Sequence, residues 1–147
     1  MKTSNVIFTQ EFKIQGGDFI NGGEASCEIG TILKEVGVDP DIILRCTVAA
    51  YEAEMNVVIY ARKGTMYFSI DTDNIVLKVH DEGRGIENIE LAMQHGYSTA
   101  TEEIRELGFG AGMGLPNIKK NADIFNISSK VGKGSKLEII IHLPPKT

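Results

Sequence analysis

The sequence predicts an α+β protein, a two-layer α/β sandwich in which helices cover one face of a mixed β-sheet. Two observations support this fold class. Stretches with the period of amphipathic helices alternate with short runs rich in β-branched residues, and their order is strand, two helices, two strands, helix, glycine-rich loop, helix and two strands. The chain has 147 residues, 42% of them hydrophobic and 24% charged, which suits one globular domain with a sizeable core.

Caps and turns justify the elements in order. Gly37 ends the first helical pattern as a C-cap glycine would, and Asp39 and Pro40 supply an N-cap and a first helical residue for the second. Residues 62–64 close that long helix, and the Asp and Asn side chains of residues 71–74 suit a tight turn between two strands. The expected helices are 19–36, 41–61, 86–95 and 112–123, with a mobile loop at 96–111, and the expected strands are 6–14, 65–70, 75–80, 125–130 and 136–142, the last two joined by a hairpin turn at 131–134.

Charge and cysteine content narrow the class of protein. The net charge of −5 at pH 7, with both signs mixed along the chain, argues against nucleic acid or an anionic membrane surface as the main partner. The N-terminus lacks the apolar core of a signal peptide, and no apolar run approaches the ~20 residues of a membrane span. Cys27 and Cys46 are too few for a disulfide scaffold or a zinc site. We therefore expect a cytoplasmic protein with two reduced core thiols.

Glu52 and Asn56 are four residues apart and so share one face of the long helix. That helix is mostly apolar, and polar side chains in it cost stability unless they have partners. An amide oxygen is a hard ligand that suits Mg²⁺, and a carboxylate one turn away can orient or deprotonate a water or hydroxyl that attacks a phosphate. Glu54 lies on another side of the helix and Met55 is apolar, so neither belongs to this pair. The alternative is a surface helix with two solvated polar residues.

Asp81 follows the strand expected over 75–80 and begins the pattern Asp-x-Gly-x-Gly. A carboxylate there can accept a hydrogen bond from an exocyclic amine, while Gly83 and Gly85 let the backbone close around a flat ring. The alternative is an ordinary β-turn with an exposed Asp.

Alternating glycines lead into the helix expected over 112–123. Without side chains, their backbone N–H groups can approach phosphate oxygens, and a helix N-terminus adds a positive dipole end. No Lys-Ser/Thr follows as in a P-loop, and no strand leads directly into the run as in a Rossmann motif. The alternative is a flexible loop with spaced glycines. The glycines are Gly108, Gly110, Gly112 and Gly114.

In this order, the three segments resemble the motifs of the GHKL ATPase superfamily, which includes gyrase, Hsp90, histidine kinase and MutL-type proteins. Residues 52–56 match its N box, residues 81–85 its G1 box, residues 108–114 its G2 box and residues 132–135 its short G3 box. The resemblance extends over nearly the whole chain. It implies a Bergerat fold, as in histidine-kinase and Hsp90-like ATPases, and a single GHKL-type ATP-binding domain over residues 1–147.

Within the superfamily the chain looks most like the bacterial partner-switching serine kinases and anti-sigma factors, and in particular like the RsbT-like form. The similarity lies in the stretch 95–99 before the lid and in residues 110–116, while the charged insert 100–107 and Met55 depart from the pattern. Such proteins bind a STAS-domain antagonist or scaffold and phosphorylate it on Ser or Thr, or hold a sigma factor inactive. A phosphatase is a further candidate partner, and a homodimer is a candidate assembly.

The resemblance also assigns roles to single residues. It implies that Glu52 is the catalytic base, that Asn56 holds Mg²⁺ and that Asp81 contacts the adenine amine of ATP. The lid glycines would cover the phosphates. The other residues placed beside the nucleotide are Gly83, Gly85, Ile86, Gly108, Gly110, Gly112, Met113, Gly114, Leu115 and Ser135.

Together, these features lead us to expect an ATP-dependent protein-serine/threonine kinase that acts on a small STAS regulator. A nucleotide-gated anti-sigma factor that sequesters its partner with little turnover is the main alternative. A detached histidine-kinase catalytic domain fits less well, because Glu52 stands where those proteins usually carry Asn or a similar polar residue. A degenerate fold that binds no nucleotide is the remaining alternative.

Overall fold

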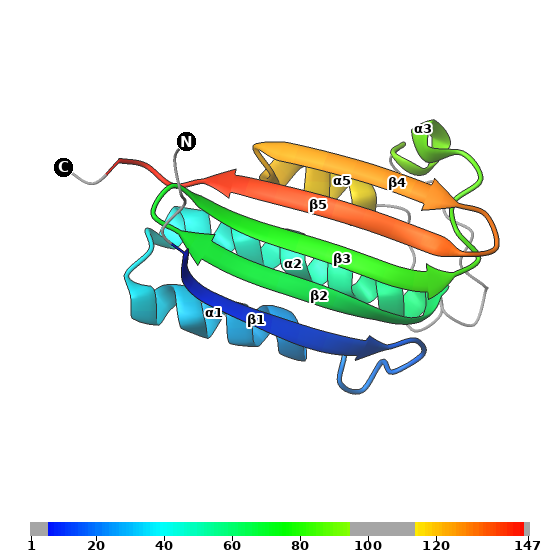
Figure 1. Ribbon diagram of the computed structural model, residues 1–147, viewed down its shortest axis with the longest axis horizontal. Coiled ribbons are helices and arrows are strands. Elements are labelled where there is room, and N and C mark those ends of the chain that lie inside the picture. The colour runs from blue at the N-terminus through cyan, green and yellow to red at the C-terminus, as the bar shows by residue number, and fades with distance from the viewer. Residues whose placement is uncertain (1–5, 95–113, 146–147) are drawn as a thin grey trace.

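The computed structural model describes residues 6–94 and 114–145, which form a five-stranded sheet with helices on one of its faces (Figure 1). The two-layer α/β sandwich expected from the sequence is therefore confirmed. In chain order, the elements are β1 (Val6–Gln15), α1 (Glu24–Val36), α2 (Pro40–Tyr60), β2 (Ala61–Asp71), β3 (Asn74–Gly83), α3 (Ile89–Ala92), α5 (Gly114–Asn121), β4 (Ile124–Lys130) and β5 (Gly134–His142).

The strand order is β1-β2-β3-β5-β4, and each neighbouring pair is antiparallel. The expectation of a mixed sheet was wrong in this respect. The chain leaves β3, passes through α5 and returns as β4 in the same direction as β3, which would give a parallel pair. The hairpin then turns β5 back between them, so that Asn74 pairs with His142 and His80 with Lys136. Because β5 separates the two parallel strands, every ladder between neighbours is antiparallel.

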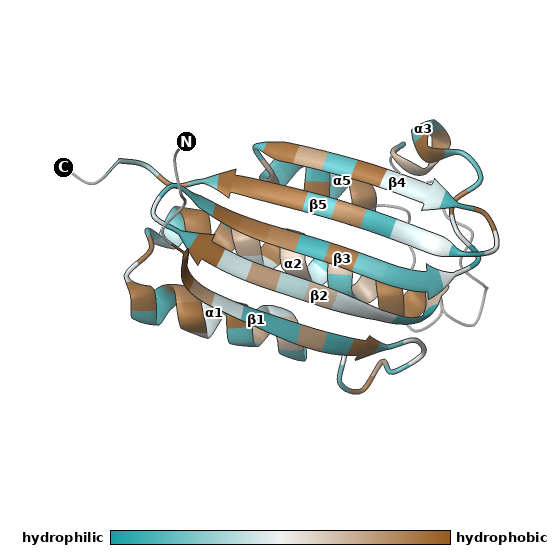
Figure 2. Cartoon of the chain, viewed as in Figure 1, coloured by the Kyte–Doolittle hydropathy of each residue, from teal (hydrophilic) through white to brown (hydrophobic). Residues whose placement is uncertain are grey.

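The core lies between the sheet and the helices, and it follows from the alternation of side chains along the strands. Apolar and polar residues share the strands in Figure 2, as expected of a sheet with one covered face. On α2 the small side chains Ala49, Ala50 and Ala53 are fully buried and let the helix approach the sheet closely. None of the described helices is both long and apolar enough to cross a membrane. The largest fully buried side chains are Phe68, Ile29, Leu33, Met66, Ile70, Ile75, Leu77, Ile118, Ile139, Ile141, Val57 and Val79.

Local signals set most element ends. The Asp39 side chain accepts a hydrogen bond from the Asp41 N–H at 3.1 Å, so α2 begins where the sequence predicts. Gly37 adopts a left-handed conformation, with φ of 89°, and caps α1. The Asp71 carboxylate accepts from the backbone N–H groups of Asp73 and Asn74, each at 2.7 Å, and forms the predicted turn.

Other ends differ from the expectation. Helix α2 stops at Tyr60, and residues 62–64 belong to β2 rather than to a turn that closes the helix. Helix α1 starts at Glu24, five residues later than expected, because Gly23 has φ of 104° and ends a turn. Helix α3 is shorter than the expected 86–95, since the backbone before Asn88 is engaged with the sheet.

Glu54 fixes the start of α1 from a distance. Its buried carboxylate accepts hydrogen bonds from the backbone N–H groups of Gly23 at 2.9 Å, Ala25 at 3.2 Å and Ser26 at 3.0 Å. These groups are among the unpaired donors that every helix N-terminus presents. A side chain from α2 therefore caps α1, in place of the local N-cap side chain that sequence reasoning looks for.

The two cysteines lie in different environments. Cys46 is fully buried, and burial raises the pKa of its thiol to about 12, so it is the inert core thiol that the sequence predicts. Cys27 lies on the exposed side of α1, and its prediction as a core residue was wrong. Residue 27 falls between Ser26 and Glu28 on a helix that faces the sheet with Ile29 and Leu33, and hydropathy alone does not tell which side a cysteine takes.

Candidate functional site

Glu52 lies on the part of α2 that faces α5. Its side chain is hydrogen bonded to the side chain of Asn117, in the first half of α5. A Cβ atom at Gly114, the first residue of α5, would lie 3.2 Å from the Glu52 Oε2 atom, so the carboxylate sits against the start of that helix. Asn56 is one turn further along α2 and is also partly exposed. The pair predicted from its spacing is therefore positioned beside the segment that follows the glycine run.

Burial raises the pKa of the Glu52 carboxyl above its usual range, and the hydrogen bond from Asn117 opposes this shift. The net shift is upward, so the pKa of Glu52 lies closer to neutral pH than that of a glutamate in water. A general base works best when its pKa lies near the working pH. Glu52 thus has the accessibility and the direction of pKa shift that a base needs.

Asp81 occupies the inward side of β3 near its end and meets the first residues of β5. Its Oδ1 atom accepts a hydrogen bond from the Ser135 N–H at 3.0 Å. Burial raises the pKa of the Asp81 carboxyl, and the Ser135 hydrogen bond opposes this shift. Sequence reasoning placed Asp81 in a turn after the strand, whereas the ladder continues to Gly83. The carboxylate is therefore held by the sheet rather than by a free loop.

Two glycines let the segments around Asp81 come together. Gly85 has φ of 77°, and a Cβ there would lie 2.5 Å from the Lys130 carbonyl oxygen. Gly134 has φ of 148°, and a Cβ there would overlap the Asp81 backbone carbonyl. The segments are joined by a hydrogen bond from the Gly83 N–H to the Lys133 carbonyl at 3.1 Å. Glycine is required at both positions by conformation and by close approach.

Sequence reasoning missed Ser129, which organises this end of the sheet. Its hydroxyl oxygen accepts from the Ile86 N–H at 2.7 Å, lies 3.1 Å from the Gly134 carbonyl and lies 2.9 Å from the Ser135 hydroxyl oxygen. The sequence did contain a signal for Ser129. Side chains of a strand alternate between its two faces, so Ser129 lies on the same inward face of β4 as Phe125 and Ile127. A polar residue at an inward position requires a partner.

The remaining predicted residues divide into three groups. Ser135 is buried beside Asp81, and Ile86 is tied to Ser129 through its backbone N–H. Gly114 begins α5 next to Glu52, whereas Leu115 is buried in the hydrophobic core. The structure thus joins Asp81, Gly83, Gly85, Ile86 and Ser135 at one end of the sheet and Glu52 and Gly114 between α2 and α5. The predictions for Gly108, Gly110, Gly112 and Met113, and for residues 95–99 and 100–107, lie outside the described residues.

The donor set of α2 fits a magnesium ion that is held mainly through a nucleotide. Among residues 6–94 and 114–145, no three His, Cys, Asp or Glu side chains gather closely enough to hold a metal ion. Mg²⁺ commonly takes one or two protein ligands and completes its octahedron with waters and phosphate oxygens. Asn56 offers an amide oxygen and Glu52 a carboxylate, which are the hard oxygen donors that this ion accepts.

Comparisons with known proteins show to which family the chain belongs. The profile of the histidine kinase-like ATPase domain matches residues 24–141. The serine/threonine-protein kinase RsbT of Bacillus subtilis (strain 168) is 30% identical over 113 residues, which are 74% of this chain and 79% of that protein. An anti-sigma F factor of Anoxybacillus flavithermus (strain DSM 21510 / WK1) is 33% identical over 129 residues, 84% of this chain and 85% of that protein.

A solved structure supports the fold. The SiaB–SiaC complex from Pseudomonas aeruginosa contains a chain that superposes with a TM-score of 0.61 at 14% identity, covering 94% of this chain and 92% of that one. At this identity the likeness concerns the fold alone. The matched profile spans the elements from α1 to β5 and includes Glu52, Asn56 and Asp81. The chain therefore belongs to the family of histidine kinase-like ATPase domains.

Proposed function

We propose that this protein is a switch kinase, which uses ATP and Mg²⁺ to phosphorylate a serine or threonine of a STAS-domain regulator. The observation that carries the proposal is the Glu52 carboxylate, partly buried, with a raised pKa, against the start of α5. Its relatives include a protein named as a serine/threonine-protein kinase. A glutamate at position 52 can deprotonate a hydroxyl. The catalytic domain of a histidine kinase does not need such a base.

At the other end of the site, Asp81 would accept a hydrogen bond from the exocyclic amine of adenine. Ser135 and Ser129 connect β3, β4 and β5 at this end of the sheet through the hydrogen bonds described above. Gly85 lets the segment after β3 approach the Lys130 carbonyl closely, which fixes the backbone next to Asp81. This arrangement favours adenine over guanine, because guanine presents a carbonyl oxygen at the matching position and a carboxylate would repel it.

In the reaction, Asn56 would hold the magnesium ion, and the ion supplies positive charge that neutralises the phosphates. Glu52 takes the proton from the partner's hydroxyl group while the oxygen of that hydroxyl forms a bond to the γ-phosphorus. The bond from that phosphorus to the bridging oxygen breaks, and ADP leaves with the electron pair. The products are ADP, a phosphorylated partner and a protonated Glu52, which returns its proton to solvent.

Phosphotransfer tests this function directly. The protein and its Glu52→Ala variant are incubated with Mg²⁺ and γ-labelled ATP beside purified candidate STAS proteins. We expect a labelled Ser or Thr in one partner, and a loss of about 10²–10⁴-fold in rate in the variant, which is typical for removal of a general base. Nucleotide binding, measured by calorimetry, should remain. Equal transfer by the variant would remove Glu52 from its role.

A second candidate function is a nucleotide-gated anti-sigma factor that sequesters its partner with little turnover. The anti-sigma F factor at 33% identity favours it. Tight, ATP-dependent partner binding without a phosphorylated product would support this alternative against the kinase.

A further inference from the structure

Three inward side chains form a row across the end of the sheet that carries Asp81. Ser135 on β5 is the direct ladder partner of Ser129 on β4, and the Ser135 N–H donates to Asp81 on β3 at 3.0 Å. Ser135 is buried, and Asp81 and Ser129 are partly buried. The hydroxyl oxygens of the two serines lie 2.9 Å apart, so one of them donates to the other.

The other contacts of Ser129 decide the direction of that bond. A serine hydroxyl has one proton to donate and two lone pairs that accept. The Ile86 N–H donates to the Ser129 oxygen at 2.7 Å and occupies one lone pair, and the Gly134 carbonyl, which only accepts, receives the Ser129 proton at 3.1 Å. The remaining lone pair of Ser129 faces Ser135. The Ser135 hydroxyl is therefore the donor, and Ser129 has used its whole hydrogen-bonding capacity.

This direction determines what Ser135 offers to a bound molecule. Since its proton points to Ser129, the Ser135 oxygen presents only lone pairs to its other neighbours. The ionised Asp81 carboxylate beside it also only accepts hydrogen bonds. The two neighbouring side chains thus form a set of acceptors without a donor, which attracts an amino group and repels a carbonyl oxygen.

We infer that Ser129 is a positioning residue for nucleotide specificity, which acts through Ser135 without touching the base. By taking the Ser135 proton, it keeps this end of the site selective for a purine with an amino group at C6 over a purine with a carbonyl oxygen there. Without Ser129, the Ser135 hydroxyl could rotate and donate to such a carbonyl, and the selectivity would weaken. The inference rests on the proposed binding of ATP beside Asp81.

The test measures the affinities of ATP and ITP by isothermal titration calorimetry, in the wild type and in Ser129→Ala. The base of ITP is hypoxanthine, which carries a carbonyl oxygen at C6 where adenine carries its amino group. We expect the wild type to prefer ATP, and Ser129→Ala to lower the ratio of the two affinities about 3–10-fold, the size of one neutral hydrogen bond. A merely structural loss would weaken both nucleotides equally and leave this ratio unchanged.

Further variants of the two strands serve as controls. Ser128→Ala removes a neighbouring hydroxyl on the exposed face of β4, and it should keep the wild-type ratio. Ser129→Thr retains a hydroxyl at the inward position and should also keep the ratio. In a Ser135→Ala background, Ser129→Ala should not change the ratio further, because the proton that it would release is absent.

Three results would overturn the inference. They are an unchanged ratio in Ser129→Ala, an equal change in Ser128→Ala, and a wild type that binds ATP and ITP with equal affinity. In each of these cases nucleotide binding, and with it the proposed function, would stand. A wild type that binds neither nucleotide would instead overturn the proposed function, together with the specificity role that rests on it.

A second measurement needs no nucleotide. Amide hydrogen exchange at Ile86 is followed by NMR in the nucleotide-free wild type and in Ser129→Ala. We expect faster exchange in the variant, because the Ile86 N–H loses its acceptor. Unchanged exchange at Ile86 would overturn the hydrogen-bond geometry from which the direction of the Ser135 bond was deduced.

Discussion

At the scale of single residues, Glu52 and Asp81 share one property. Each is partly withdrawn from water, and burial raises the pKa of each carboxyl despite one opposing hydrogen bond. A raised folded-state pKa means that the folded protein binds the proton more tightly than the unfolded chain does. The ionised forms therefore lower the stability of the fold as pH rises from the unfolded-state pKa to the folded-state pKa. The protein retains both acids against this cost, which is typical of groups kept for binding or chemistry.

Substitution of Asp81 tests its proposed contact with the adenine of ATP. In Asp81→Asn, the amide oxygen can still accept from Ser135, but an NH₂ group would face the adenine amine. We expect ATP affinity to fall about 10–100-fold, equivalent to about 1–3 kcal/mol for an unsatisfied donor. Isothermal titration calorimetry of both proteins measures this change. In the wild type, affinity should also fall as pH drops through the pKa of Asp81, because the protonated acid is a poorer acceptor.

The neighbouring exposed Glu82 provides the control, since it pairs with Lys63 at 3.3 Å on the surface. Glu82→Gln should bind ATP as the wild type does. An Asp81→Asn variant with wild-type affinity and pH dependence would show that the carboxylate does not read the adenine amine.

Sequence reasoning located these residues unevenly. Glu52 and Asn56 were predicted because they lie four residues apart on one helix. Asp81 was predicted because it follows an expected strand and begins an Asp-x-Gly-x-Gly pattern. Ser129 was missed because its importance depends on the contact with Ile86, which is far away in the sequence. Spacing rules detect residues that share an element, whereas this contact joins different elements.

At the scale of elements, the link between α1 and α2 depends on Glu54. Cap signals such as Asp39 before Pro40 are local, and α2 accordingly begins where the sequence predicts. The start of α1 was misplaced because its cap is a side chain from another helix. The expectation of a mixed sheet was wrong for the same reason, since pairing of β5 with β3 depends on the whole fold.

Replacement of Glu54 tests this remote cap. Glu54→Gln keeps one acceptor oxygen but places an NH₂ group among the backbone donors of Gly23, Ala25 and Ser26. We expect a loss of about 1–3 kcal/mol in the free energy of unfolding, because buried donors are left unpaired. Each kcal/mol should lower Tm by about 2–4 °C in a domain of this size. Urea unfolding followed by circular dichroism measures the change.

The exposed Glu35 on α1 supplies the comparison, and Glu35→Gln should unfold within about 0.5 kcal/mol of the wild type. Equal stability of both variants would mean that the three hydrogen bonds to Glu54 contribute little to the fold.

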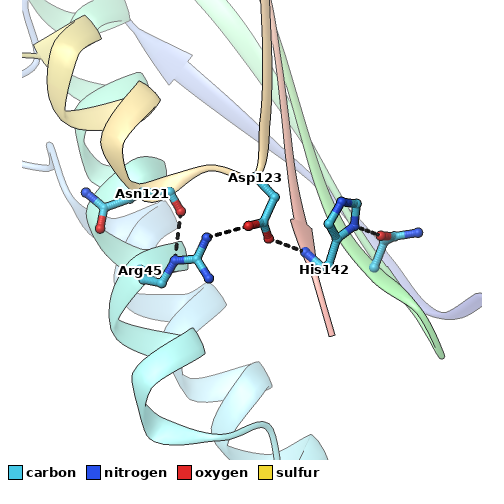
Figure 3. Close-up of polar contacts among 5 residues, drawn as sticks. Arg45, Asn121, Asp123 and His142 are labelled. Atoms are coloured by element: carbon cyan, nitrogen blue, oxygen red, sulfur yellow. Dashed lines mark hydrogen bonds and ion pairs between the residues drawn. The ribbon is translucent and has the colours of Figure 1, made fainter. Parts of the chain in front are cut away.

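At the scale of the whole molecule, a polar network lies at the end of the sheet opposite to Asp81. Arg45, Asp123 and His142 join α2, the end of α5 and the end of β5, and the His142 ring lies 2.7 Å from the Asn74 side-chain oxygen (Figure 3). The His142 backbone N–H holds the pKa of Asp123 below its usual range, with Arg45 adding to the shift and partial burial opposing it. The network thus connects both layers of the sandwich.

Replacement of Asp123 tests that connection. A carboxyl whose folded-state pKa is lowered stabilises the fold above its unfolded-state pKa, and this contribution is lost as pH falls through the folded-state pKa. Since the group is about one third exposed, we expect Asp123→Asn to lower the free energy of unfolding at pH 7 by less than about 1 kcal/mol. The difference should disappear in strongly acidic solution. Urea unfolding at several pH values measures it, with the exposed Glu87→Gln as control. A deficit that is independent of pH would contradict the assignment to the ionised carboxylate.

The place of β5 in the sheet has a consequence for how the protein folds. Because β5 lies between β3 and β4 and pairs Asn74 with His142, the middle of the sheet cannot close until nearly all of the intervening chain has been gathered. Such long-range pairing slows folding. The hydrogen bond from the Ser135 N–H to Asp81 forms only when β5, the last strand, enters the sheet. The end of the sheet that carries Asp81 is therefore among the last parts of the protein to take shape.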